Sequence, residues 1–271
     1  MIELLAPALV ACLLLACILS YFGLHVLLRE VIFVDLALAQ LAALGAAVGH
    51  LLSAHTDSFA TYLYSFAFTL AGAAIFALAR PAKARLPQEA LIGIVYGVSA
   101  ALVILLVSKS ALDRDEVESM LTGRLLFAEW GEIGAMALLF GAVALLHFAL
   151  RRQFLEISEQ SRTYASPTRR QQLLDFVFYA SFGVVVTSSV QLSGVLVVFG
   201  LLIVPAACGA IFFAGISNRI LASWAIGTLT CSAGVAASAL WDLPTGAAVV
   251  AALGVVFALA VIGSIFRRTP D

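Results

Sequence analysis

The basic residues of this chain lie in every second gap between long apolar segments. Twelve of the fifteen Lys and Arg residues fall in one set of gaps, and three fall in the alternate set. Cytoplasmic loops of multi-span membrane proteins collect Lys and Arg, and this bias over short loops sets the orientation of the chain. The alternation therefore predicts a protein that crosses a membrane many times.

Nine apolar stretches can be read between these gaps. Each has about 18–25 residues, which is enough for a helix to cross a hydrocarbon core of about 30 Å. We predict an all-α, polytopic helical bundle with nine transmembrane helices, or eight if one short span is re-entrant, forming a single domain over residues 1–271. The stretches are 3–28, 31–53, 59–79, 90–108, 132–150, 173–190, 192–215, 220–240 and 245–266.

The charge bias is greatest with the N-terminus outside and the C-terminus inside. The outer gaps then hold only Lys109, Arg114 and Arg124. The first apolar run has no basic segment before it and is too long for a cleaved signal peptide, so we expect a retained span. The inner gaps hold Arg29, Arg80, Lys83, Arg85, Arg151, Arg152, Arg162, Arg169, Arg170, Arg219, Arg267 and Arg268.

Composition excludes several classes of protein. Hydrophobic residues make up 63% of the chain and charged residues 11%, whereas a soluble domain has about 25% charged residues. No basic patch suggests a nucleic-acid partner. The sequence has no G-x-x-x-x-G-K-[ST] motif, so we expect no ATPase activity of its own and no enzyme chemistry. Any ATP that drives transport would be hydrolysed by another subunit.

The second apolar stretch carries three polar residues, Asp35, Gln40 and His50. An ionisable side chain inside a membrane costs about 2.5–3.5 kcal/mol, so it normally faces a cavity or a partner. We expect these residues to line a translocation path, with Asp35 as the metal ligand. On one helix Asp35 and His50 lie about 22 Å apart in height, so they cannot bind the same ion. The alternative is that Asp35 pairs with Arg29 or contacts lipid headgroups.

Four further patterns carry structural predictions. Pro205 interrupts an apolar stretch and would bend its helix, as a gating element does. Two GxxxG pairs, Gly45 with Gly49 and Gly93 with Gly97, would allow close helix contacts. The long outer loop, 109–131, is acidic and amphipathic and favours a short helix at the membrane surface. The four cysteines, Cys12, Cys17, Cys208 and Cys231, lack C-x-x-C spacing and are expected to be packing residues.

Local motifs then point to a family. The run from Gly194 to Pro205-Ala-Ala is similar to Gly-x-Leu-Leu-x-x-x-Leu-Leu-Ile-x-Pro-Ala-Ala, and Ser238 to Gly246 is similar to Ser-x-x-x-Asp-x-Pro-x-Gly. Both motifs are typical of the permease subunits of bacterial ABC importers for zinc, manganese or iron(II), which this chain resembles over nearly its whole length. It departs from them in the second span, where Gln40 stands at the usual histidine and Leu36 at the usual aspartate.

The resemblance implies a homodimer surrounded by lipid in the bacterial cytoplasmic membrane. It also implies a separate ABC ATPase, an external metal-binding protein, and a transported divalent zinc, manganese or iron ion with no resident cofactor. The basic inner loop 151–172, with Arg162, Arg169 and Arg170, would contact the ATPase. Loss of the Asp/His pair favours harder ions such as Mn²⁺ over zinc, because a glutamine amide is a poor zinc ligand.

Two other classes of protein stay open at this point. One is a secondary transporter driven by an ion gradient, with Asp35 as the proton or sodium site. Such transporters usually carry internal repeats and broken helices. The other is a membrane scaffold that transports nothing. A neighbouring gene for a Walker-type ATPase would separate the ABC class from both.

A cysteine at position 162 tests the orientation. In a cysteine-free background, we expect a membrane-impermeant thiol reagent to leave Arg162→Cys unmodified in sealed cells and to modify it after lysis, because basic loops stay in the cytoplasm. The measurement is the mass shift of the labelled protein on a gel. Modification in sealed cells would contradict the predicted orientation.

Overall fold

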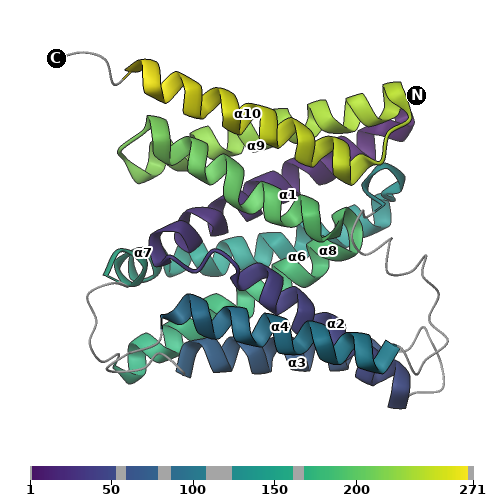
Figure 1. Cartoon of the computed structure of the whole chain (residues 1–271), viewed down its shortest axis with the longest axis vertical. Helices are drawn as coiled ribbons and strands as arrows, with labels where there is room; N and C mark the ends of the chain where they lie inside the picture. Colours follow the sequence, from purple (N-terminus) through teal and green to yellow (C-terminus); the bar gives the residue numbers. More distant parts are fainter. Residues whose placement is uncertain (1, 53–58, 79–86, 108–123, 161–167, 268–271) are drawn as a thin grey trace. The chain divides into compact units, whose positions relative to one another are not determined.

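The structure is a computed structural model that describes residues 2–52, 59–78, 87–107, 124–160 and 168–267. These residues are helical almost throughout and contain no strand. Figure 1 shows the helices and their labels. They are α1 (Ile2–Arg29), α2 (Val34–Leu52), α3 (Phe59–Leu78), α4 (Gln88–Val107), the 3-10 helix η1 (Leu125–Phe127), α6 (Trp130–Ala149), α7 (Arg151–Gln160), α8 (Arg169–Phe212), α9 (Ile216–Trp241) and α10 (Thr245–Arg267).

Within the described ranges, eight helices are long and apolar enough to cross a membrane. One of them, α8, has 44 residues and contains Gly194 with φ 78° and ψ 159°. Only glycine adopts this backbone conformation readily, and it interrupts the helix. Because 44 residues of helix would be about 66 Å long, α8 has the length of two spans. The predicted polytopic helical bundle is confirmed, and Gly194 interrupts α8 two residues after the start of the predicted stretch 192–215.

The chain divides into two compact units. The first unit contains Met1–Leu27, Glu118–Leu146 and Ser188–Asp271, and the second contains Leu28–Val117 and His147–Thr187. Each unit therefore draws on segments that are far apart in sequence. Whether the two act as the single domain expected from the sequence stays a prediction.

In the first unit, α9 and α10 lie side by side (Figure 1). A methyl group on Gly234 of α9 would meet the Val249 Cα of α10 at 2.5 Å, so only glycine permits this approach. The indole Nε1 of Trp224 on α9 donates a hydrogen bond of 2.8 Å to the Cys17 carbonyl on α1. Close helix packing and hydrogen bonds hold such bundles together in lipid, where the hydrophobic effect between helices is weak.

In the second unit, α2 packs on α3 and on α4 (Figure 1). A Cβ atom on Gly45 would lie 2.5 Å from the Tyr64 carbonyl oxygen, and one on Gly49 would lie 2.9 Å from the Thr61 Cα. The Ser65 hydroxyl donates a 2.6 Å hydrogen bond to the Ala42 carbonyl across the same contact. The first GxxxG pair is therefore a helix contact.

The second GxxxG pair behaves differently. A Cβ atom on Gly93 or Gly97 would find no heavy atom of the described residues within 4 Å. Both lie on α4, of which few residues are buried. The pair makes no close helix contact within the described part of the chain.

The long loops correspond only in part to the predictions. The outer loop 109–131 was expected to form a surface helix, and most of it falls within residues 108–123, outside the described residues. Its described part holds η1, and α6 begins after it. The inner loop 151–172 contains a helix, α7, that none of the predicted apolar stretches covers.

Paired glycine substitutions test the helix contact. We expect Gly45→Ala to destabilise the solubilised protein by about 1–3 kcal/mol, because its methyl group meets backbone atoms that cannot move aside. Gly97→Ala is the matched control and should change stability by less than about 1 kcal/mol. The measurement is the denaturant midpoint in detergent. Equal effects of the two variants would show that the contact is absent.

Candidate functional site

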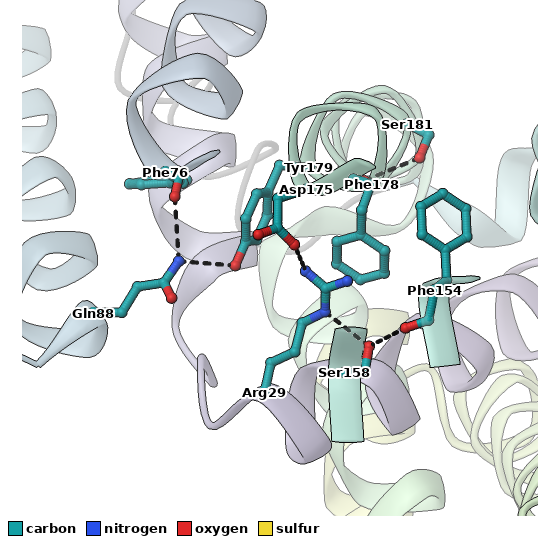
Figure 2. A network of polar contacts seen from close by, with 9 residues as sticks. All are labelled: Arg29, Phe76, Gln88, Phe154, Ser158, Asp175, Phe178, Tyr179 and Ser181. Atoms are coloured by element: carbon teal, nitrogen blue, oxygen red, sulfur yellow. Dashed lines mark hydrogen bonds and ion pairs between the residues drawn. The ribbon is translucent and has the colours of Figure 1, made fainter. Parts of the chain in front are cut away.

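A buried ion pair forms the centre of the polar network in the second unit (Figure 2). Arg29 Nη1 lies 2.7 Å from Asp175 Oδ1, and both side chains are fully buried. Arg29 Nε donates a 2.9 Å hydrogen bond to the Ser158 hydroxyl on α7. Because the partner of Arg29 is Asp175, the alternative that Asp35 pairs with Arg29 is wrong. The pair also places Asp175, at the start of the sixth predicted span, in the protein interior.

Aromatic rings surround the guanidinium. The Arg29 Cζ lies 3.9 Å from the centre of the Phe178 ring and 5.7 Å from the centre of the Tyr179 ring. Such stacking favours arginine because its planar cation is weakly hydrated. Gln88 Nε2 on α4 donates to the Tyr179 hydroxyl at 2.9 Å and to the Phe76 carbonyl at 3.3 Å. The network therefore joins the end of α1 with α3, α4, α7 and α8.

His147, near the end of α6, packs against both α7 and α8. Its Nε2 lies 2.8 Å from the Ser181 hydroxyl, and its ring stacks on Phe154 at 4.5 Å between centres. Phe154, Ile157 and Ser158 form the buried face of α7. His147 is thus a buried packing residue.

Asp35 lies in the first turn of α2 and is 1% exposed. Its Oδ1 has no hydrogen-bond partner among the described residues. Glu89 of α4 accepts a 3.2 Å hydrogen bond from the Phe33 amide through Oε1, while its buried Oε2 likewise has no partner in the described ranges. The start of α2 therefore lies beside two carboxylates, Asp35 of α2 and Glu89 of α4, each with one oxygen that makes no hydrogen bond to a described residue. Such oxygens can accept a hard divalent cation.

The other predicted path residues do not join Asp35. Gln40 and His50 are half-buried on the same helix, and His50 lies in its last turn. The described residues contain no group of three His, Cys, Asp or Glu side chains that could hold a metal ion.

Pro205 lies inside α8, in the first unit. Its ring nitrogen cannot bond to the Leu201 carbonyl one turn earlier. The Ser20 hydroxyl of α1 donates to that carbonyl at 3.5 Å, and the Ser223 hydroxyl of α9 donates to the Pro205 carbonyl at 3.0 Å. Neighbouring helices thus satisfy the backbone around the proline, as membrane helices require.

Two of the three arginines predicted to contact the ATPase lie within the described part of the chain. Arg169 and Arg170 are exposed in the first turn of α8, whereas Arg162 lies outside the described residues. Helix α7 adds an exposed charged face opposite its buried one, made of Arg152, Glu156 and Glu159, and Arg151 is exposed in its first turn.

Comparison with known proteins identifies the family. The model of the ABC 3 transport family matches residues 1–264. The chain belongs to this family. It is a multi-pass membrane permease of a metal-type ABC importer. An uncharacterized membrane protein of Synechocystis sp. is 24% identical to the permease over 266 residues, which cover 98% of this chain and 92% of that protein.

Two further similarities extend the comparison. The manganese transport system membrane protein MntB of Synechocystis sp. is 26% identical to the permease over 183 residues, which cover 67% of this chain and 59% of MntB. A chain of PsaBC from Streptococcus pneumoniae, solved in complex with Fab, matches the fold with a TM-score of 0.74 at 19% identity, covering 95% of the permease and 90% of that chain. A protein described as a metal-chelate type ABC transporter, in an inward-facing conformation, matches with a TM-score of 0.69 at 17% identity, covering 96% and 88%.

Sequence reasoning missed three residues of the permease's polar network. Arg29 and Asp175 each lie at the end of an apolar stretch, where a charged side chain normally reaches the membrane surface. Ser158 was hidden in a polar segment without a motif. A signal existed for α7 alone, since Phe154, Ile157 and Ser158 follow helical spacing between charged residues.

Loss of one partner tests the buried ion pair. We expect Asp175→Asn to destabilise the permease by about 3–5 kcal/mol, because it leaves the Arg29 charge buried and uncompensated. The control is Glu132→Gln, which breaks the exposed Arg124–Glu132 pair and should cost no more than about 1 kcal/mol. Denaturant midpoints in detergent report both values. Equal losses would refute the burial of the pair.

Proposed function

We propose that this permease imports a divalent transition metal ion, with manganese preferred to iron and zinc, powered by a separate ABC ATPase. The observation that carries the proposal is the pair of carboxylates at the start of α2, Asp35 and Glu89, with one unpartnered oxygen each among the described residues. Oxygen donors suit Mn²⁺ better than the nitrogen and sulfur ligands that zinc prefers. The likeness to a protein named for manganese transport supports the same cargo.

Asp35 is proposed as the last residue of α2 that the imported ion meets, because the start of this helix follows the inner gap at Arg29. Its carboxylate is desolvated, so a dehydrating cation regains there some of the electrostatic stabilisation that it loses on leaving water. With no third ligand of the His, Cys, Asp or Glu type in the described ranges, binding stays weak enough for release. Weak binding is what transport needs, because the ion must leave as readily as it enters. Gln40 and His50 would line the same path further along α2.

The proposed partners follow from the family and from the charged surfaces. An ATPase would dock on the cytoplasmic side, against the exposed face of α7 and the basic residues Arg162, Arg169 and Arg170. A second copy of the chain would complete the path, and an external binding protein would deliver the metal. The N-terminus would lie outside the bacterial cytoplasmic membrane and the C-terminus inside.

Transport would proceed by alternating access. ATP binding to the ATPase shifts an equilibrium between outward-open and inward-open states, which it can do only if it binds them with different affinity. Pro205 would let α8 bend between these states. Membership of an ABC transport family argues against a gradient-driven transporter and a scaffold.

Metal uptake into proteoliposomes, reconstituted with the ATPase, tests the proposal. We expect ATP-dependent Mn²⁺ uptake to fall by about tenfold or more in Asp35→Asn, the equivalent of about 1.4 kcal/mol of lost stabilisation of the ion, because the charge is removed. Asp35→Glu should retain part of the uptake, and the control Glu132→Gln should retain all of it. Full uptake by Asp35→Asn for each metal would remove Asp35 from the path. Uptake without ATPase would favour a gradient-driven mechanism.

A further inference from the structure

We infer that Arg29 is a positioning residue for energy coupling: it links α7 mechanically to the turn that carries Asp35. The inference rests on the proposed function in one respect, which is that an ATPase must act on α7. Its evidence lies in the geometry of one side chain. We call the set of Arg29, Ser158, Asp175 and Phe178 the Arg29 linkage.

The Arg29 linkage constrains the guanidinium in three directions at once (Figure 2). Nη1 lies 2.7 Å from Asp175 Oδ1, Nε donates to Ser158 at 2.9 Å, and the flat face lies over the Phe178 ring. The guanidinium is planar and rigid, so a movement of its partners changes its orientation as well as its position. A lysine ammonium is a compact charge on a flexible stem and would not be oriented in this way. A displacement of α7 along α8 must therefore move Arg29 or break its hydrogen bond to Ser158.

Helix α7 has one buried face and one exposed charged face, which a cytoplasmic ATPase could contact. Its buried face holds Phe154, Ile157 and Ser158, while its opposite face exposes Arg152, Glu156 and Glu159. The hydroxyl of Ser158 also donates to the Phe154 carbonyl at 2.8 Å, which fixes its lone pairs toward Arg29. The exposed face is therefore free to meet a partner while the buried face engages the linkage.

The other side of the linkage leads to Asp35 through a short turn. Residues 30–33 connect α1 to α2, and Glu30 has a left-handed backbone with φ 56°. Val31 is fully buried, its carbonyl accepts from the Val34 amide at 3.3 Å, and Glu89 accepts from the Phe33 amide. Because packing and hydrogen bonds both fix this turn, we expect it to move as a rigid unit. Motion of Arg29 would therefore shift the first turn of α2 and its carboxylate.

Part of the linkage is open to rearrangement. Arg29 Nη2 is buried and makes no hydrogen bond to any residue that the structure describes. A buried donor without an acceptor is costly in one conformation and becomes favourable in another that supplies one. The linkage thus has a donor ready for an acceptor in a second state of the transporter.

A purely structural role for Arg29 predicts something different. If the linkage only held the fold together, its weakening would lower transport and ATP hydrolysis by the same factor. If it couples them, metal transported per ATP hydrolysed falls while hydrolysis continues. The ratio of the two rates separates the roles.

The experiment measures both rates in proteoliposomes that contain the permease and its ATPase. We expect Ser158→Ala and Arg29→Lys to lower the number of Mn²⁺ ions transported per ATP by about fivefold or more, the range of a typical coupling free energy. Ser158→Ala keeps the ion pair, so it should fold and retain the ATPase even if Arg29→Lys does not. The control is Ser65→Ala, another buried serine whose hydroxyl bonds to Ala42, and it should leave the ratio unchanged.

A second readout does not depend on the metal. A spin label at Phe33→Cys, an exposed position in the turn, should change mobility when the complex binds ATP, and this change should be lost in Ser158→Ala. An unchanged transport ratio, an equal fall in both rates, or a label response that survives Ser158→Ala would overturn the inference. A complex that shows the label response but carries none of the three metals would retain the linkage and refute the proposed cargo. Failure of the permease to bind any ATPase would overturn both.

Discussion

The interior of this protein depends on how a buried positive charge is satisfied where water is excluded. Arg29 has no exposed surface, so its charge is tolerable only beside Asp175 and over the Phe178 ring. The removal of either charge would leave the other desolvated, which proteins rarely tolerate. This requirement brings the end of α1, the start of α8 and the short helix α7 together. The polar contacts of α3 and α4 then follow through Tyr179 and Gln88.

The same requirement applies to the buried polar atoms that have no hydrogen-bond partner among the described residues. Asp35 Oδ1 and Glu89 Oε2 are buried without hydrogen bonds among the described residues, although Asp35 follows closely on Arg29, whose Nε and Nη1 both have partners. Pro205 shows the opposite case, in which neighbouring serines complete the backbone around a break. A transporter needs both kinds of site, because a rigid framework must surround a place where an ion can bind briefly.

Much of the fold follows from local pattern. The apolar stretches predicted the helices to within a few residues, and Gly194 interrupts α8 close to the boundary between two stretches that the sequence had separated. Asp35 was singled out because a charge inside an apolar run is costly wherever it lies. Glu89 lies at the edge of an apolar stretch and gave no such signal, and its hydrogen bond to the Phe33 amide could not be foreseen, because 56 positions separate the two residues. The two GxxxG pairs look alike in sequence, yet only Gly45 and Gly49 meet a neighbouring helix.

The sequence by itself determined that the chain crosses a membrane many times and which gaps hold its positive charges. It could do so because transfer of a segment into lipid depends on the residues of that segment alone. The tertiary structure decided which polar groups meet: that Arg29 pairs with Asp175 and leaves Asp35 unpaired, and that Ser158 of α7 joins them. Those choices depend on contacts between residues far apart in the chain, where distance and orientation, rather than composition, set the electrostatic energy.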